Sequence, residues 1–170
     1  MPKFQSQFAT GKYGTPIDSS GDVVALKVDF PVSAAMVDSG GVVRANFAAN
    51  DVIEMFDLPA GHVIDDLVLV SDDIDSNGAP AVSLSVGFIN TTDNGLDVSA
   101  ANGGAALIAA SNIGQAGGVA RPTTAATWRI APQESGARRR VGILVVAAPA
   151  TLQAGTLSLV ARLRSAHYGL

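Results

Sequence analysis

The sequence predicts an all-β protein, a jelly-roll-like antiparallel β-sandwich with an extended N-terminal arm. Apolar and polar residues alternate over several stretches, with the period of a half-buried strand. Segments rich in Gly, Pro, Asn and Asp separate these stretches at intervals of roughly ten residues, as in β-sandwiches. The Ala-rich residues 104–113, followed by Gly117–Gly118, are expected to form the one short helix of the fold.

The chain is expected to divide into an N-terminal arm, residues 1–21, and a single sandwich domain, residues 22–170, because composition does not change within the latter range. The arm is polar but contains Phe4, Phe8 and Tyr13 as isolated aromatic residues. Two interpretations stay open: a loose terminus, or an arm that lies on a neighbouring subunit with the three aromatic rings as anchors.

Three strands are expected before residue 60. The first places Val24, Leu26, Val28 and Phe30 on one face, and Pro31 ends it. The second places Val43, Ala45 and Phe47 on one face, and the third ends at the Pro–Ala–Gly turn that follows Leu58. The expected ranges are 23–30, 41–49 and 51–59.

The next two strands, residues 62–70 and 81–89, are expected to pair through an acidic connection that begins like a calcium-binding EF-hand loop. If Asp73 is position 1, the glutamate required at position 12 is replaced by Leu84. The flanking segments also have the period of strands rather than helices. A turn is therefore favoured over the alternative, an incidental cation site. That alternative site would use Asp73, Asp75 and Asn77.

Three more strands are expected towards the C-terminus. The last is the clearest, because Leu157, Leu159, Ala161 and Leu163 alternate with Thr156, Ser158, Arg162 and Arg164. The expected ranges are 123–132, 139–149 and 155–166.

The residues that carry enzyme chemistry are scarce. The chain has no Cys, and its two His residues, His62 and His167, lie in no motif of a catalytic triad or a metal site. Only 5% of the residues are aromatic, and the single Trp128 is expected in the core or in an interface. The sequence therefore predicts neither catalytic residues nor a cofactor, and the protein is not expected to be an enzyme.

Charge is sparse and unevenly distributed. Residues 1–100 carry a net charge of −10 and residues 101–170 one of +6, so the two halves could pair within the fold or between copies. With only 15% charged residues, much of the surface is expected to be covered by partners. The basic cluster Arg138, Arg139 and Arg140 is interpreted as a solvated strand end or, alternatively, a partner contact. Nucleic acid and membranes are not expected as partners, and no secretion signal is expected.

Residues 50–165 resemble small virion proteins of tailed bacteriophages. The resemblance rests on a D-V-I strand, an L-P-A-G turn, a strand that ends in S-D-D-x-D, an A/T-rich strand that ends in V-G, and a final hairpin with A-A-P-A-T and A-G-T. These motifs lie at Asp51–Ile53, Leu58–Gly61, Ser71–Asp75, Ala81–Gly87 and Ala147–Thr156.

The resemblance implies a head decoration, or cement, protein of the jelly-roll or β-sandwich type. Such a protein is made in the cytoplasm of the host bacterium. It then binds the major capsid protein on the outer capsid surface of the virion, where it stabilises contacts between shell subunits. It would self-associate as a homotrimer or, alternatively, as a dimer, and it would have no catalytic residues. An alternative from another class is a glycan-binding or adhesin module of a phage head fibre or tail.

Overall fold

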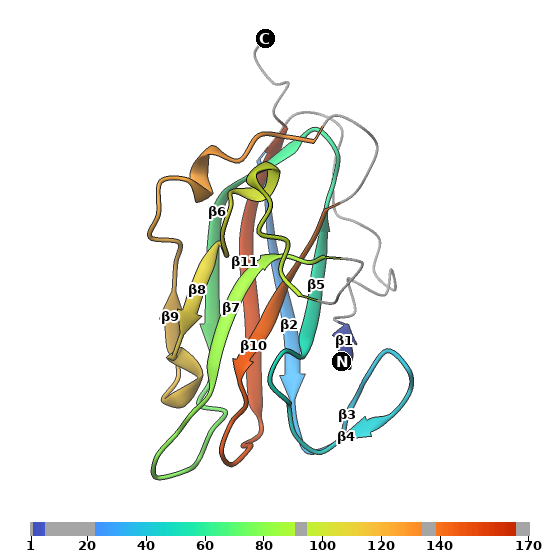
Figure 1. Cartoon of the computed structure of the whole chain (residues 1–170), viewed down its shortest axis with the longest axis vertical. Helices are drawn as coiled ribbons and strands as arrows, with labels where there is room; N and C mark the ends of the chain where they lie inside the picture. Colours follow the sequence, from blue (N-terminus) through green and yellow to red (C-terminus); the bar gives the residue numbers. More distant parts are fainter. Residues whose placement is uncertain (1, 6–22, 91–94, 134–138, 166–170) are drawn as a thin grey trace.

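The computed structural model describes residues 2–5, 23–90, 95–133 and 139–165 and contains two packed β-sheets and a separate two-stranded hairpin (Figure 1). The five-stranded sheet comprises β1 (Lys3–Gln5), β5 (Val52–Leu58), β10 (Arg139–Ala147), β7 (Ser83–Phe88) and β8 (Ile108–Ser111) in spatial order. The four-stranded sheet comprises β2 (Val24–Val32), β11 (Gly155–Ser165), β6 (His62–Ser71) and β9 (Gly118–Ala120). The hairpin comprises β3 (Met36–Val37) and β4 (Val43–Arg44).

The strand order is that of a jelly roll. When the eight principal strands are numbered along the chain from β2, omitting the hairpin, one sheet has the order 1-8-3-6 and the other the order 2-7-4-5. Successive strands thus cross repeatedly between the sheets, as two interleaved Greek keys require. The predicted all-β, jelly-roll-like sandwich is confirmed, with the addition that β1 joins the edge at β5 in a parallel pair.

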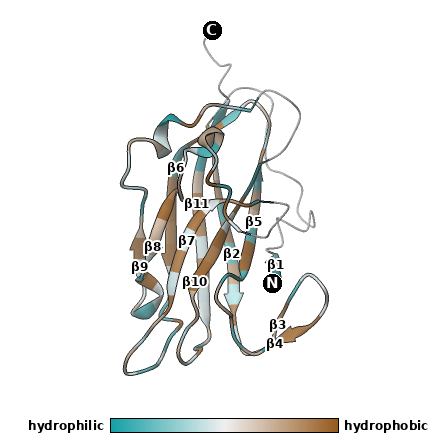
Figure 2. Cartoon of the chain, viewed as in Figure 1, coloured by the Kyte–Doolittle hydropathy of each residue, from teal (hydrophilic) through white to brown (hydrophobic). Residues whose placement is uncertain are grey.

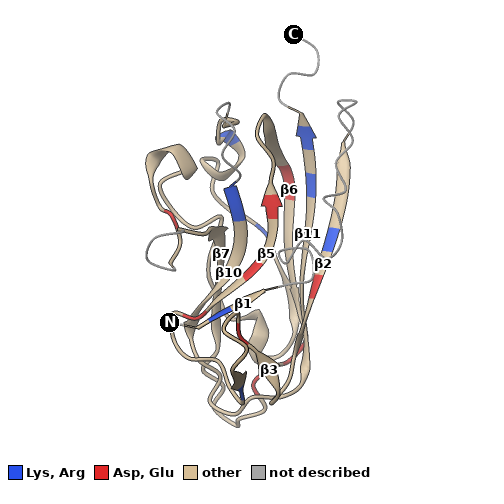
Figure 3. Cartoon of the chain, turned by 90° about the vertical axis from the view of Figure 1, so that its right-hand side faces the viewer, with Lys and Arg blue, Asp and Glu red and all other residues tan. Residues whose placement is uncertain are grey.

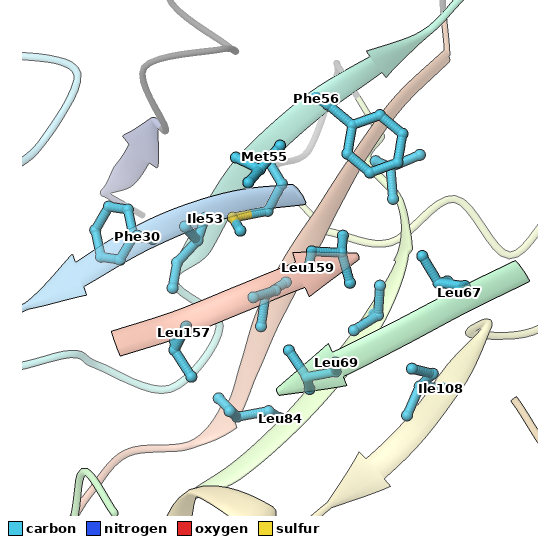
Figure 4. Close-up of a cluster of buried hydrophobic side chains, with 14 of the residues drawn as sticks. Phe30, Ile53, Met55, Phe56, Leu67, Leu69, Leu84, Ile108, Leu157 and Leu159 are labelled. Atoms are coloured by element: carbon cyan, nitrogen blue, oxygen red, sulfur yellow. The ribbon is translucent and has the colours of Figure 1, made fainter. Parts of the chain in front are cut away.

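The core fills the space between the sheets with aliphatic, phenylalanine and methionine side chains (Figure 4). Leu157, Leu159 and Leu163 of β11 are essentially inaccessible to solvent and face inward, as the alternation predicted. Opposite them, Ile53 and Ile143 occupy paired positions on β5 and β10. The strand that the periodicity predicted most clearly, β11, therefore contributes a row of side chains to the core, whereas β5 is buried on both faces.

The short helix predicted at residues 104–113 is absent, and the prediction was wrong. This segment instead contains β8, and the described chain around it forms only two 3₁₀ turns, Ala100–Asn102 and Ile113–Gln115. Ile108 is buried against the core, and β8 pairs with β7 at a sheet edge. Burial against the sandwich therefore outweighs the helix propensity of alanine.

Three strand assignments also need correction. The predicted strand 123–132 contains instead a single 3₁₀ turn, Thr127–Arg129. Of the predicted strand 41–49 only the two residues of β4 are extended, and they belong to the hairpin. Pro31 does not end β2, which continues to Val32, because β2 is an edge strand and one side of its backbone needs no ladder partner.

The connection between β6 and β7 was predicted to join a strand pair, but these two strands lie in different sheets. The acidic residues 72–81 therefore cross one end of the sandwich. The same correction applies to the expected final hairpin, because β10 and β11 also lie in opposite sheets. Alternation in the sequence identifies strands but not their neighbours, since the pairing depends on contacts distant in sequence.

The start of the chain is more tightly bound to the sandwich than an arm would be. β1 is hydrogen-bonded in the five-stranded sheet, and Phe4 is fully buried. The remainder of the predicted arm, residues 6–21, lies outside the described residues. No helix among the described residues is long and apolar enough to cross a membrane.

Candidate interaction surface

The β3–β4 hairpin projects away from the body of the sandwich, at its lower right in Figure 1. Val37, Val42 and Val43 on this hairpin are 55%, 50% and 62% exposed. They are three of only eight large hydrophobic side chains exposed among the described residues. Figure 2 colours part of this hairpin, beside the labels β3 and β4, as hydrophobic. We call these three side chains the valine tip.

Asp38 holds the hairpin in a fixed conformation. Its Oδ1 accepts hydrogen bonds from the backbone N–H groups of Gly40 and Val42, both at 2.9 Å. Its Oδ2 accepts a hydrogen bond from Arg44 Nε, also at 2.9 Å, and forms an ion pair with the same guanidinium. The hydrogen bond from the Val42 amide, with those from Arg44 and Gly40, holds the pKa of Asp38 below its usual value.

The base of the hairpin is anchored to the sandwich by aromatic packing. Phe4 contacts Phe47 edge to face at a centroid distance of 5.2 Å and Phe30 at 5.9 Å. A backbone contact to β1 adds to this packing, because the Ser39 N–H donates a 2.7 Å hydrogen bond to the Lys3 carbonyl. The valine tip is therefore presented on a preorganised support, so that binding a partner would cost little conformational entropy.

A second candidate feature is a cluster of charged residues on β1, β5 and β10 (Figure 3). Glu54 is only 3% exposed, and its carboxylate contacts Arg140 at 2.7 Å, Gln5 at 2.7 Å and Lys3 at 3.5 Å. Arg140 also forms two hydrogen bonds with Asp57. Hydrogen bonding to Asp57, together with the charges of both carboxylates, raises the pKa of Arg140.

The three arginines predicted as an interface therefore have different environments. Arg138 lies outside the described residues. Arg139 is 9% exposed, lies over the ring of Phe88 at 4.8 Å and makes long hydrogen bonds to Asn102 and to the His62 carbonyl. Its burial lowers its pKa. Arg139 and Arg140 are thus neither a solvated strand end nor a free basic patch, because both already have partners within the chain.

The charges of the two halves of the chain pair within the fold. Arg121 contacts Asp66 at 2.7 Å, and Arg164 contacts Asp65 at 3.3 Å. The sheet interleaves strands from both halves, so acidic β6 lies beside basic β11. The charge asymmetry of the sequence therefore explains contacts inside one subunit, and a ring of oppositely charged halves is not needed to account for it.

The acidic connection is organised around backbone donors. Asp75 is 1% exposed, and its carboxylate accepts four backbone hydrogen bonds, from residues on two different loops. These donors are Ala81, Val82, Ala150 and Thr151, at 2.7–3.2 Å. Burial alone would raise the pKa of Asp75, but the four amide donors together outweigh it and hold the pKa far below its usual value.

The other residues of the cation-site alternative are also occupied by local hydrogen bonds. Asp73 Oδ1 accepts the Asp75 N–H at 3.1 Å, and Asn77 Oδ1 accepts the Ala79 N–H at 2.9 Å. Among the residues that the structure describes, no group of three or more His, Asp or Glu side chains is arranged to hold a metal ion. The structure favours the turn interpretation, in which these side chains satisfy the backbone of the loop.

The aromatic anchors predicted in the arm are only partly described. Phe4 lies in the chain's own core, so its prediction as an anchor on a neighbouring subunit was wrong; Phe8 and Tyr13 lie outside the described residues. Trp128 is 42% exposed, which excludes the core location but not the interface location. The valine tip was missed by the sequence reading, although the run Val-Asp-Ser-Gly-Gly-Val-Val has the composition of a hairpin turn between apolar residues.

No protein-family model matches the sequence, and no curated protein matches it. Two solved structures do match. A chain from the capsid of Ralstonia phage GP4 is 34% identical, with a TM-score of 0.75, over 96% of this chain and 97% of that one. A chain from the capsid asymmetric unit of cyanophage Pam1 is 18% identical, with a TM-score of 0.57, over 89% and 91% of the two chains, and it shows the fold alone.

The match to the GP4 capsid chain, at 34% identity, covers nearly the whole length of both proteins. The matched region includes the strands of both sheets of the sandwich. The chain therefore belongs to the family of phage capsid proteins and is a structural component of a phage head.

Proposed function

We propose that the protein is a decoration, or cement, protein, which binds the outer surface of the capsid and stabilises contacts between major capsid subunits. The observation that carries the proposal is the valine tip, an apolar surface held rigidly in solvent by Asp38 and Arg44. A subunit that has no binding partner gains nothing from exposing three adjacent β-branched side chains. A subunit that docks on a shell can bury them there.

A cement role follows from this arrangement by mass action. The tip adds apolar burial only when the shell is assembled, so binding favours the assembled shell over free subunits. A role of this kind needs no catalytic residue, and the protein acts as a structural component rather than as an enzyme. It is made in the host bacterial cytoplasm and ends on the outside of the virion.

Self-association as a homotrimer fits this role, with a dimer as the alternative. Several copies joined around one axis would present several valine tips to the shell at once, and multivalent attachment strengthens weak individual contacts. Light scattering on the purified protein, at low and at high salt, measures the state directly. A stable trimer or dimer supports the proposed self-association. A monomer at all concentrations would show that the free protein does not self-associate.

The proposal is tested with phage heads that lack this protein. Purified wild-type protein is added to the heads, and the amount that sediments with them and the temperature at which they disrupt are both measured. We expect saturable binding and a higher disruption temperature. The triple variant Val37→Ser, Val42→Ser, Val43→Ser is expected to lose most of both effects.

Val119 provides a matched control, because it is 60% exposed but lies on β9, on the four-stranded sheet. The variant Val119→Ser is expected to bind the heads as the wild type does. If the triple variant binds normally, the valine tip is not the docking surface. If the wild-type protein neither binds nor stabilises the heads, the cement function itself is overturned.

A further inference from the structure

A cleft of about 460 Å³ lies at the end of the sandwich, between the beginning of β6 and the 3₁₀ turn Thr127–Arg129. Its lining combines apolar side chains with three charged ones. The lining residues are Val63, Ile64, Asp65, Trp128, Arg129, Ile130, Pro132 and Arg164. A volume of this size lies within the range of small-molecule sites, and a mixed lining of this kind orients a ligand while burying part of it.

Trp128 is the only tryptophan of the chain, and it lines this cleft while remaining 42% exposed. An indole ring carries partial negative charge on its face, which attracts the C–H hydrogens of a ring laid against it. The sandwich places Trp128 outside its core, on a short turn beside Ile130. The side chain is therefore available as a flat platform for a ligand.

The charges of the cleft favour an anion. Asp65 is shared between Arg164, at 3.3 Å, and Arg162, at 3.8 Å, so a single carboxylate faces two guanidinium groups. Arg129 forms no ion pair with any carboxylate in the described part of the chain. Among the described residues that line the cleft, two arginines and one aspartate leave an excess of positive charge, although the protein as a whole has a net charge of −4. Guanidinium groups bind carboxylates through paired hydrogen bonds.

We infer that this cleft binds an acidic saccharide unit, with its ring on Trp128 and its carboxylate on Arg129 and Arg164. A sugar ring offers a C–H face for the indole, hydroxyl donors for Asp65 and, in a uronic acid, an anion for the arginines. A neutral sugar would offer no carboxylate to the guanidinium groups of Arg129 and Arg164. This activity is additional to capsid binding and does not depend on it.

The test uses the fluorescence of the single tryptophan, because every change in emission then reports on residue 128. Digalacturonate is the probe, and maltose is the neutral control of similar size. We expect digalacturonate to shift the emission to shorter wavelength in a saturable manner, with a Kd in the millimolar range or below. Maltose is expected to leave the spectrum unchanged.

Variants then separate this site from a general attraction of anions. Arg129→Gln and Arg164→Gln are each expected to weaken digalacturonate binding about tenfold or more, because each removes a charge-assisted hydrogen bond. Arg121→Gln is the matched control, since Arg121 has the same charge and is exposed but does not line the cleft. Unfolding curves verify that all three variants remain folded.

Several results would overturn the inference. One is an emission spectrum that does not respond to digalacturonate at any concentration, and another is an equal response to maltose. Equal weakening by Arg121→Gln would show that the effect is only nonspecific charge attraction. A variant ending at Ser165 whose emission moves to longer wavelength without any sugar would show that the cleft is covered by the chain's own C-terminus.

Discussion

The acidic connection around Asp75 and the hairpin around Asp38 use the same chemistry for opposite purposes. In both, a carboxylate accepts hydrogen bonds from backbone amides. Asp75 joins amides that are 6 to 76 residues away and thereby closes the end of the sandwich over Ile74, which is fully buried. Asp38 accepts backbone hydrogen bonds only from the amides of its own turn, and the valine tip remains exposed to solvent. The difference is the range of the donors: distant donors close a core, and local donors present a surface.

The largest expected effect is that of Asp75→Ala. The substitution removes the buried acceptor that four backbone N–H groups share, and we expect a loss of about 3–5 kcal/mol in the free energy of unfolding. Urea unfolding measures it. The control is Asp73→Ala, which removes a single local hydrogen bond and is expected to cost about 1 kcal/mol or less. Equal losses in the two variants would contradict the central role of Asp75.

The pH dependence of stability tests the same carboxylate. The pKa of Asp75 in the folded state lies below its unfolded value of about 3.9, so its contribution is fully present above that pH. The contribution is then lost as the pH falls below about 4. We expect wild-type stability to fall below this pH and Asp75→Asn to show a flatter curve there, measured by urea unfolding between pH 2 and about 7. If stability falls with pH equally in the wild type and in Asp75→Asn, the acid sensitivity arises from other groups.

The variant Asp38→Ala is expected to loosen the hairpin while the sandwich stays folded. Only the turn amides of Gly40 and Val42 and the guanidinium of Arg44 lose their acceptor. Hydrogen exchange at residues 38–44 should accelerate, whereas exchange in β10 and β11 should not change. Binding to phage heads should weaken, because the valine tip is no longer preorganised. Faster exchange throughout the core would show that the hairpin also supports the sandwich.

Asp51 extends the comparison to a buried carboxylate with too few donors. Its Oδ2 accepts the Ala48 N–H at 2.8 Å, but its buried Oδ1 has no hydrogen-bond partner among the described residues. Burial raises the pKa of Asp51, so its charged form destabilises the fold as the pH rises through that raised value. We expect Asp51→Asn to increase stability by up to about 1 kcal/mol at pH 7 and by less at pH 3. A loss of stability at both pH values would contradict this assignment.

The smallest expected effect on stability is that of the valine tip. Replacement of Val37, Val42 and Val43 by Ser removes no buried contact, and the free energy of unfolding is expected to change by about 0.5 kcal/mol or less for each substitution. Thermal unfolding of the purified variant measures it. A large loss would mean that the tip packs against its own subunit, and the contrast with the Asp75 loop would then disappear.

The sequence predicted most reliably what depends on local periodicity. The strands β2, β7 and β11 follow from the alternation of apolar and polar residues along the sequence. It failed at residues 104–113, where β8 pairs at a sheet edge and the burial of Ile108 outweighs helix propensity. It also failed at residues 123–132, a mostly exposed segment that pairs with no strand and contains only a 3₁₀ turn. Arg139 illustrates the same limit at the level of a side chain. Its sequence context predicted a solvated end, and the fold places it over Phe88.

The sequence by itself determined the all-β class, the inward-facing residues of the long strands, and a turn rather than an EF-hand at residues 71–81. Tertiary structure alone decided which strands are neighbours, the burial of Phe4 in its own subunit, and the use of the basic half of the chain to neutralise the acidic half internally. Side-chain alternation is a property of consecutive residues. Most strand pairing and charge neutralisation joins residues far apart in the sequence, such as Glu54 and Arg140, 86 positions apart, and Asp65 and Arg164, 99 positions apart, which only the folded chain brings together.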